Sequence, residues 1–250
     1  SYITNNALLE QYAHNFGTPT EQFKNYSLNG LNVGKPQTRP TDRAPKPMST
    51  HGDELALHPY TGKDWTNRHT ATLINISHWM HEAQIPHSIE PRNIFTDVIN
   101  HANIGDDSTA RSLKAINPDI LAKNTLIDIK HANASIGTYS AKNVRTKQGA
   151  VNFRAYTARQ QYTAHARKID RDNNGANEAE IGPVENKLNS HGKLEVPVWG
   201  AFGEGSKDAH DMIHNIAEGI AKEKWRELNY DNMKACRGMY KRIMYKEFSI

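Results

Sequence analysis

Three ionisable residues in one short segment, Asp119, Asp128 and Lys130, have the types and spacing best suited to chemistry in this chain. Between the two acids lies Lys123-Asn124, which is typical of a two-residue hairpin turn because Asn tolerates the left-handed conformation that such turns require. If these two residues form the turn, paired positions on the two strands have numbers that add up to 247. Asp119 then lies directly opposite Asp128.

Strand alternation predicts which side chains share a face of this hairpin. The polar face holds Asp119, Asp128 and Lys130, and the apolar face holds Ile120, Ile127 and Ile129. Two like charges facing each other destabilise a strand pair unless a cation lies between them. Carboxylate oxygens are ligands that Mg²⁺ accepts, together with water and phosphate oxygens. The hairpin therefore predicts a magnesium site.

Pro118, Asp119, Asp128 and Lys130 together resemble the signature of the PD-(D/E)XK, or restriction-endonuclease-like, nuclease superfamily. The resemblance implies that the two acids bind one or two Mg²⁺ ions, for which Mn²⁺ can substitute. It further implies that Lys130 orients or polarises the water that attacks a phosphodiester, and that the main-chain carbonyl of Ile129 is a further metal ligand. Glu90 is a candidate third acid.

The flanking segments follow the order of elements in that superfamily: helix, strand, hairpin, helix, strand. Apolar residues at helical spacing predict a helix over 65–83, and 85–89, ended by Pro91, is expected to be a short strand. After the hairpin we expect a helix over 150–169, a buried strand over 194–202, and a further helix that begins at the N-cap Ser206.

These elements predict an α/β fold with a restriction-endonuclease-like core, in which a central mixed β-sheet is flanked by helices. We expect the core to span residues 51–230. Residues 1–50, which contain a Pro- and Gly-rich stretch, are interpreted as an arm or linker, and 231–250 as a basic C-terminal helix.

A narrower resemblance, over roughly residues 65–220, is to the endonuclease domain of site-specific non-LTR retrotransposons and related mobile-element nucleases. It is carried by a few short segments: Arg68-His69, Asn117-Pro118-Asp119, Asp128-Ile129-Lys130, Arg159 with Tyr162, and Gly200-Ala201-Phe202-Gly203. Asn117 departs from the lysine usual at that position, and there is no zinc knuckle.

A basic stretch after the hairpin predicts contact with nucleic acid. Between Thr138 and Lys168 the chain has no acid, and aromatic and amide side chains alternate with the cations, a mixture that contacts phosphates and bases. The residues expected to bind DNA are Lys142, Arg145, Lys147, Arg154, Arg159, Tyr162, Arg167 and Lys168. The competing interpretation is an ordinary solvated face.

Whole-chain properties agree with a DNA-binding protein but do not require one. The net charge is +4 and the isoelectric point about 9.0. A single cysteine, Cys236, excludes an internal disulfide and indicates a reducing intracellular compartment. No apolar run approaches a membrane span. A homodimer would allow both strands of a duplex to be cut and is compatible with these features.

Two alternatives come from other functional classes. A protein with the same fold that only binds nucleic acid is one of them, although the intact acids and lysine argue against it. The other is a zinc peptidase, because His210 and His214 lie one helical turn apart, as in His-Glu-x-x-His enzymes. Asp211 replaces the glutamate there and is one methylene shorter.

Overall fold

A computed structural model describes residues 64–99, 113, 116–132, 147–177, 180–200 and 203–248, together with two two-residue strands, β1 (Asn32–Val33) and β2 (Lys46–Pro47). The remainder of the expected arm at 1–50 lies outside the described residues. So do Lys142, Arg145, Phe202 and the side chain of Lys147. Within the described part, no helix is both long and apolar enough to cross a membrane.

The central feature is a small mixed β-sheet with the strand order β3-β4-β5-β7. Its strands are β3 (His87–Ile89), β4 (Ile120–Ala122), β5 (Thr125–Ile127) and β7 (Lys193–Glu195). The first three strands are antiparallel neighbours, and β7 runs parallel to β5. The predicted α/β class with a mixed sheet is therefore confirmed.

Two further strands, β6 (Lys130–Ala132) and β8 (Val198–Gly200), extend this sheet. Thr125 pairs with Lys193 and Lys130 pairs with Val198, so both parallel pairs have the same offset of 68 positions. Two main-chain hydrogen bonds, from Asp128 N to Glu195 O and from Lys130 N to Pro197 O, bridge the interval between the pairs. The segments 125–132 and 193–200 therefore run side by side as two interrupted long strands.

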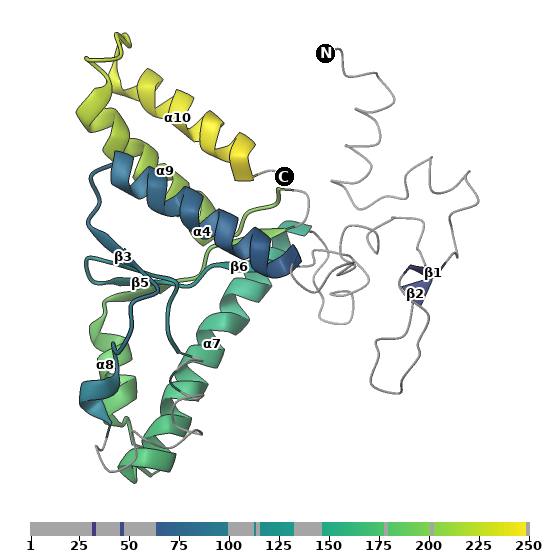
Figure 1. Ribbon diagram of the computed structural model, residues 1–250, viewed down its shortest axis with the longest axis vertical. Helices are drawn as coiled ribbons and strands as arrows, with labels where there is room; N and C mark the ends of the chain where they lie inside the picture. The colour runs from purple at the N-terminus through teal and green to yellow at the C-terminus, as the bar shows by residue number, and fades with distance from the viewer. Residues whose placement is uncertain are drawn as a thin grey trace.

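One face of the sheet is covered by α4 (Asp64–Glu82), α9 (Lys207–Lys224) and α10 (Met233–Phe248) (Figure 1). Leu73, Ile76 and Met80 of α4 join the apolar residues of α9 in one buried cluster with Ile120, Ile127 and Ile129. Ser206 begins α9 as predicted, because its hydroxyl accepts a hydrogen bond from Ala209 N.

The other face is covered by α7 (Lys147–Asn174) and α8 (Pro183–Ser190) (Figure 1). Leu126 of β5 is buried there against Tyr162 and Ile169 of α7 and Val184 of α8. The short 3₁₀ helix η1 (Thr96–Val98) follows the loop after β3. Three layers result, helices on both sides of one sheet, with the hairpin in the middle layer.

Candidate active site

The hairpin forms in the predicted register. Ile120 pairs with Ile127 and Ala122 with Thr125, and the turn residue Lys123 has a φ angle of +53°. Ile120, Ile127 and Ile129 are all buried on the face that α4 and α9 cover, as alternation predicted. The pairing of the two strands differs from the expectation at Asp119. Its main-chain N–H donates to Ile127 O, at 2.9 Å, and Asp119 does not pair with Asp128. This offset allows the Asp119 side chain to reach the main chain beyond Asp128.

Asp119 is held by two donors from different elements. Its Oδ2 accepts a hydrogen bond from Ile129 N at 2.6 Å, and its Oδ1 accepts one from Nε2 of His69 in α4 at 3.1 Å. The hydrogen bond to Asp119 is the main reason that the pKa of His69 is raised, and burial opposes it. The carboxylate is therefore oriented at the point where the sheet meets the first helix.

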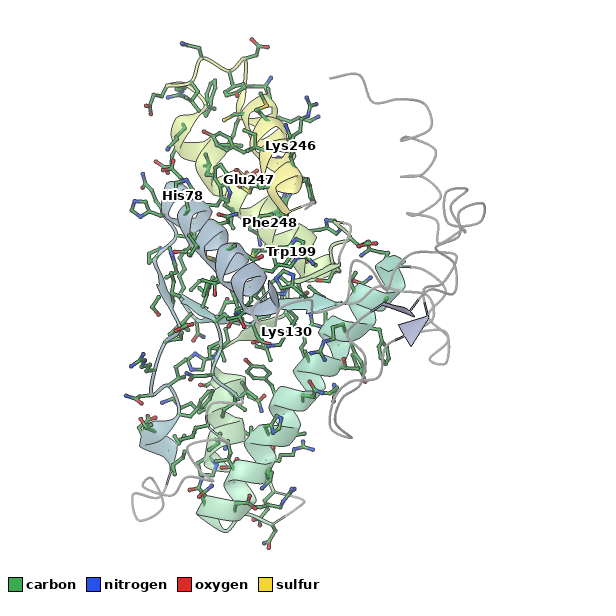
Figure 2. The ribbon with its side chains drawn as sticks, turned by 45° about the vertical axis from the view of Figure 1, so that its right-hand side comes forward. His78, Lys130, Trp199, Lys246, Glu247 and Phe248 are labelled. Atoms are coloured by element: carbon green, nitrogen blue, oxygen red, sulfur yellow. The ribbon has the colours of Figure 1, made fainter. Side chains whose placement is uncertain are left out.

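Asp128 is buried and pairs with Lys130. Its side chain is 3% exposed, and Nζ of Lys130 lies 2.8 Å from Oδ1 and 2.7 Å from Oδ2. Only Oδ1 has the geometry of a hydrogen bond, so Oδ2 is a buried carboxylate oxygen without one. Burial raises the pKa of Asp128, the ion pair with Lys130 opposes this shift, and the charge of Asp119 adds to it. Lys130 itself lies beside α7 below the first helix (Figure 2).

Glu90 reaches the same region from the end of β3. Its main-chain N–H donates to Asp119 O at 2.7 Å, and both residues line one cavity of about 680 Å³. Glu90 has a φ angle of +43°, an uncommon conformation for a residue with a side chain. The predicted third acid is therefore placed next to Asp119 by a main-chain contact. Among the described residues, however, no group of three or more His, Cys, Asp or Glu side chains is arranged to hold a metal ion.

The Tyr162 side chain is buried beside the site and does not present an exposed ring. It is 4% exposed, and its hydroxyl donates to the main-chain carbonyl of Asn117 at 3.1 Å. Burial first, and then the charge of Asp128, raises the pKa of Tyr162. The expectation that its ring contacts nucleic acid is therefore corrected, because the ring packs between α7 and the hairpin.

Three of the predicted DNA-binding cations on α7 are engaged in ion pairs. Arg159 pairs with the buried Asp208 and also donates from Nε to Leu194 O at 3.2 Å. Arg167 pairs with the buried Glu185, and Lys168 pairs with Asp172 on the same helix. Arg159 and Arg167 have structural partners that lie far along the chain. The local acid-free stretch did not reveal these partners, so both residues have structural contacts that the sequence did not predict, and their contact with DNA stays a prediction.

The helical spacing also separates these cations. At 100° per residue, Arg159 and Arg167 lie on one side of α7, whereas Arg154 and Lys168 lie on the opposite side. The basic residues in the described part of α7 therefore do not form a single stripe along one side of the helix. Arg154 is half-buried and has no ion pair within the described residues, so among the predicted cations that the structure describes it is one that stays available to a phosphate.

The two histidines of the zinc alternative contact the C-terminal helix. Nδ1 of His210 lies 2.8 Å from the hydroxyl of Tyr245, and Nδ1 of His214 lies 3.5 Å from Nζ of Lys241. Both contacts join α9 to α10, which gives the histidines a packing role. Arg237 of the basic C-terminal helix also pairs with Glu218 of α9. The described residues thus offer no support for a zinc site here.

Sequence reasoning did not assign a role to His69 or to Asp208. His69 belongs to the Arg68-His69 segment of the narrower resemblance. Because it lies 50 positions from Asp119, no local pattern in the sequence indicates their contact. Asp208, in α9, accepts hydrogen bonds from Val196 N and from Arg159 of α7. It therefore joins both helices to the segment between β7 and β8.

Comparison of the chain with models of known protein families, with curated proteins and with solved structures finds no match.

The donor set fits a hard divalent cation held by few protein ligands. Asp119 and Asp128 supply carboxylate oxygens, and Oδ2 of Asp128 is buried without a hydrogen bond. Mg²⁺ binds through one or two carboxylates and keeps several waters, so a third protein acid is unnecessary. Each carboxylate also contacts a nitrogen group of the protein, Asp119 that of His69 and Asp128 that of Lys130.

Proposed function

We propose that this chain is a magnesium-dependent endonuclease of the PD-(D/E)XK class that hydrolyses phosphodiester bonds in DNA. The observation that carries the proposal is the buried Asp128, which contacts Lys130 and whose pKa is raised by burial and by the charge of Asp119. Asp128 lies in the gap between the paired segments β5–β7 and β6–β8. A buried carboxylate whose ionisation is disfavoured gains stabilisation when it binds a cation.

The arrangement of elements supports this class. Helix α4 precedes an antiparallel set of three strands, and α7 and α8 then precede β7, a strand that runs parallel to the third. This is the order inferred from the resemblance, with the acids at the hairpin in the middle of the sheet. Function depends on the site more than on the fold, so the fold only adds to the argument from the acids and the lysine.

Each side chain has a separate task in the proposed hydrolysis. Bound Mg²⁺ would lower the pKa of a water and polarise the phosphate. Asp119 and Asp128 would hold the ion, and the hydrogen-bond contact with His69 fixes the orientation of Asp119. The water would give up one proton to solvent as its oxygen forms a new bond to phosphorus. The bond to the leaving oxygen would break, and that oxygen would take a proton from solvent. Nζ of Lys130 contacts the Asp128 carboxylate and the side chain is partly exposed, so Lys130 would turn towards a bound phosphate and stabilise the charge that develops on it.

A second candidate is a protein that binds nucleic acid without cutting it. The ion pairs of Asp119 with His69 and of Asp128 with Lys130 favour it, because both carboxylates already have partners within the protein. Incubation with supercoiled DNA, with and without magnesium, separates the two candidates. Metal-dependent nicking supports the nuclease, and binding without nicking supports the alternative.

A further inference from the structure

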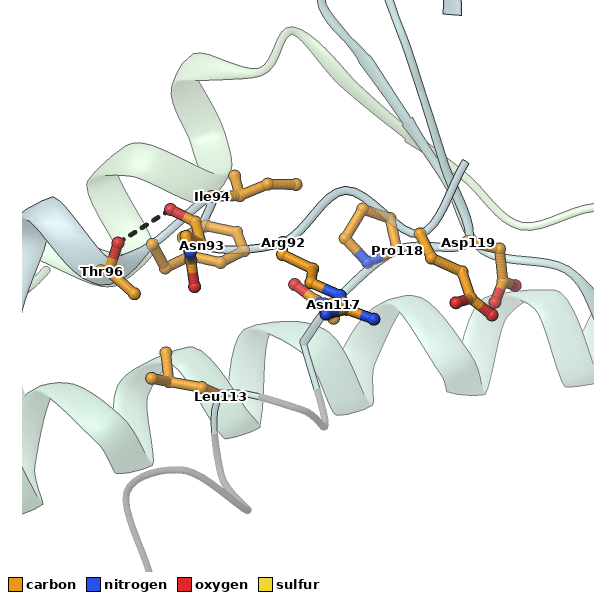
Figure 3. A pocket seen from close by; sticks show the side chains of 10 residues that line it. Arg92, Asn93, Ile94, Thr96, Leu113, Asn117, Pro118 and Asp119 are labelled. Carbon is orange, nitrogen blue, oxygen red and sulfur yellow. Dashed lines mark hydrogen bonds between the residues drawn. The ribbon is translucent and has the colours of Figure 1, made fainter. Parts of the chain in front are cut away.

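A cavity of about 680 Å³ lies beside the candidate acids, at the loop that follows β3 (Figure 3). The loop 90–96 forms one wall, and residues 117–119 together with Leu113 form another. Asp119 lies at one end of the cavity, so a group bound inside would be next to the proposed cleavage point. Binding pockets for small organic groups have volumes of about 300–1,000 Å³, and this cavity lies within that range.

The lining suits a neutral, flat, partly polar group. Ile94, Phe95, Leu113 and Pro118 supply apolar surface. Asn93 and Asn117 carry amide groups, which both donate and accept hydrogen bonds and can therefore meet the edge of a nucleobase. The carboxylates of Glu90 and Asp119 disfavour a bare phosphate inside the cavity, since like charges repel.

Arg92 is an exposed residue of the cavity lining (Figure 3). Within the described residues it has no ion-pair partner, whereas Arg159, Arg167 and Lys168 on α7 are paired. An arginine in this position can contact the phosphate of a nucleotide whose base enters the cavity. Base and phosphate would then be recognised by different parts of one site.

We propose that the cavity lined by Arg92, Asn93 and Asn117 takes one unpaired nucleotide adjacent to the scissile phosphate. This inference rests on the proposed nuclease function and adds a substrate class, nucleic acid with an unstacked or single-stranded nucleotide at the cleavage point. A base within an intact duplex cannot enter a cavity in the protein unless it leaves the stack, which costs a few kcal/mol. Substrates that already contain an unpaired nucleotide avoid this cost.

The cavity can be tested without catalysis, by methyl NMR on the full chain with labelled Ile, Leu and Met residues. Thymidine 5′-monophosphate is expected to shift the signals of Ile94 and Leu113 in a saturable manner. The signal of Met239, which is exposed on α10, serves as the internal control. Inorganic phosphate at the same concentration is expected to leave Ile94 and Leu113 unchanged, and equal shifts with phosphate would overturn the proposal.

Two arginine variants then test the role of Arg92. Arg92→Ala should weaken thymidine monophosphate binding about tenfold, as expected for loss of one charge-assisted contact. Arg171→Ala removes another exposed arginine, on α7 and outside the cavity lining, and should leave the affinity unchanged. Equal losses of affinity in both variants would show that Arg92 acts only through its general positive charge, and would contradict the assignment.

The affinities for two DNA duplexes test whether the cavity binds part of the substrate. In calcium, the parent should bind a duplex with one unpaired nucleotide about tenfold more tightly than the fully paired duplex, and Arg92→Ala should remove most of that difference. A parent that nicks DNA but shows neither the preference nor the NMR shifts refutes the cavity and leaves the nuclease proposal standing. A parent that shows both but never cleaves refutes the nuclease chemistry and supports the binding site.

Discussion

Nε2 of His69 lies 3.1 Å from Oδ1 of Asp119, although the two residues are 50 positions apart in the chain. The contact joins α4 to the hairpin at the candidate active site. It also ties the protonation of one side chain to the charge of the other, because the pKa of His69 is raised chiefly by its hydrogen bond to Asp119.

The first prediction concerns the pH dependence of this contact. Since the pKa of His69 is raised in the folded state, the pair stabilises the protein fully below the unfolded value of about 6.5, and the contribution is lost as pH rises through the raised value. We expect the difference in melting temperature between the parent and His69→Ala to be largest in mildly acidic buffer and to shrink towards pH 9. A difference that grows with pH would contradict the assigned contact.

The second prediction concerns Asp128. Because the pKa of Asp128 is raised in the folded state, folding favours its protonated form. The parent should therefore lose stability as the pH rises through the raised pKa. Asp128→Asn removes this cost, so its melting temperature without metal should equal or exceed that of the parent at neutral pH, while cleavage is abolished. Lys130 is partly exposed and can turn to solvent when its partner is removed. Added magnesium should raise the melting temperature of the parent alone.

The third prediction separates chemistry from binding at Lys130. Lys130→Ala should reduce the cleavage rate on the order of a hundredfold, which corresponds to a few kcal/mol of transition-state stabilisation. Affinity for DNA measured in calcium should stay close to that of the parent. Lys123→Ala is a matched control on the same hairpin, since Lys123 is exposed at the turn. Parallel losses of binding and rate in Lys130→Ala would make this residue a phosphate anchor.

The fourth prediction distinguishes two arginines of α7. Arg159→Ala should lower the free energy of unfolding by about 1–3 kcal/mol, because it leaves the buried Asp208 without its cation. If this ion pair is the only role of Arg159, the slope of log affinity against log salt should stay unchanged. Arg154→Ala should have little effect on stability and should flatten that slope by about one unit if Arg154 contacts a phosphate. Denaturant unfolding and salt titrations on both variants measure the two effects, and the reverse pattern would contradict the structural role of Arg159.

The hairpin was predictable because its signals are local. The two-residue turn Lys123-Asn124 sets the register, although Lys123 and not Asn124 takes the left-handed conformation, and the alternation of Ile127 and Ile129 sets the buried face. Helical periodicity likewise predicted the buried faces of α4 and α9. These features need only the neighbouring residues and the period of each element.

The partners of the basic residues were not predictable by the same means. Arg159 meets Asp208, which is 49 positions away, and Tyr162 meets Asn117, which is 45 positions away. Composition marked the stretch as basic, but it could not reveal that these side chains turn inward when α7 packs against the sheet. The offset between Asp119 and Ile127 was also hidden, because it depends on the hydrogen bond from Ile129 N to the Asp119 carboxylate.

The most direct test is the conversion of supercoiled plasmid DNA by the purified chain, with the Asp128→Asn variant prepared and measured in parallel. The proposed function predicts nicked and then linear DNA in magnesium or manganese, no conversion in chelator, and no conversion by the variant under any condition. Intact plasmid in both metals, or equal conversion by parent and variant, would contradict it.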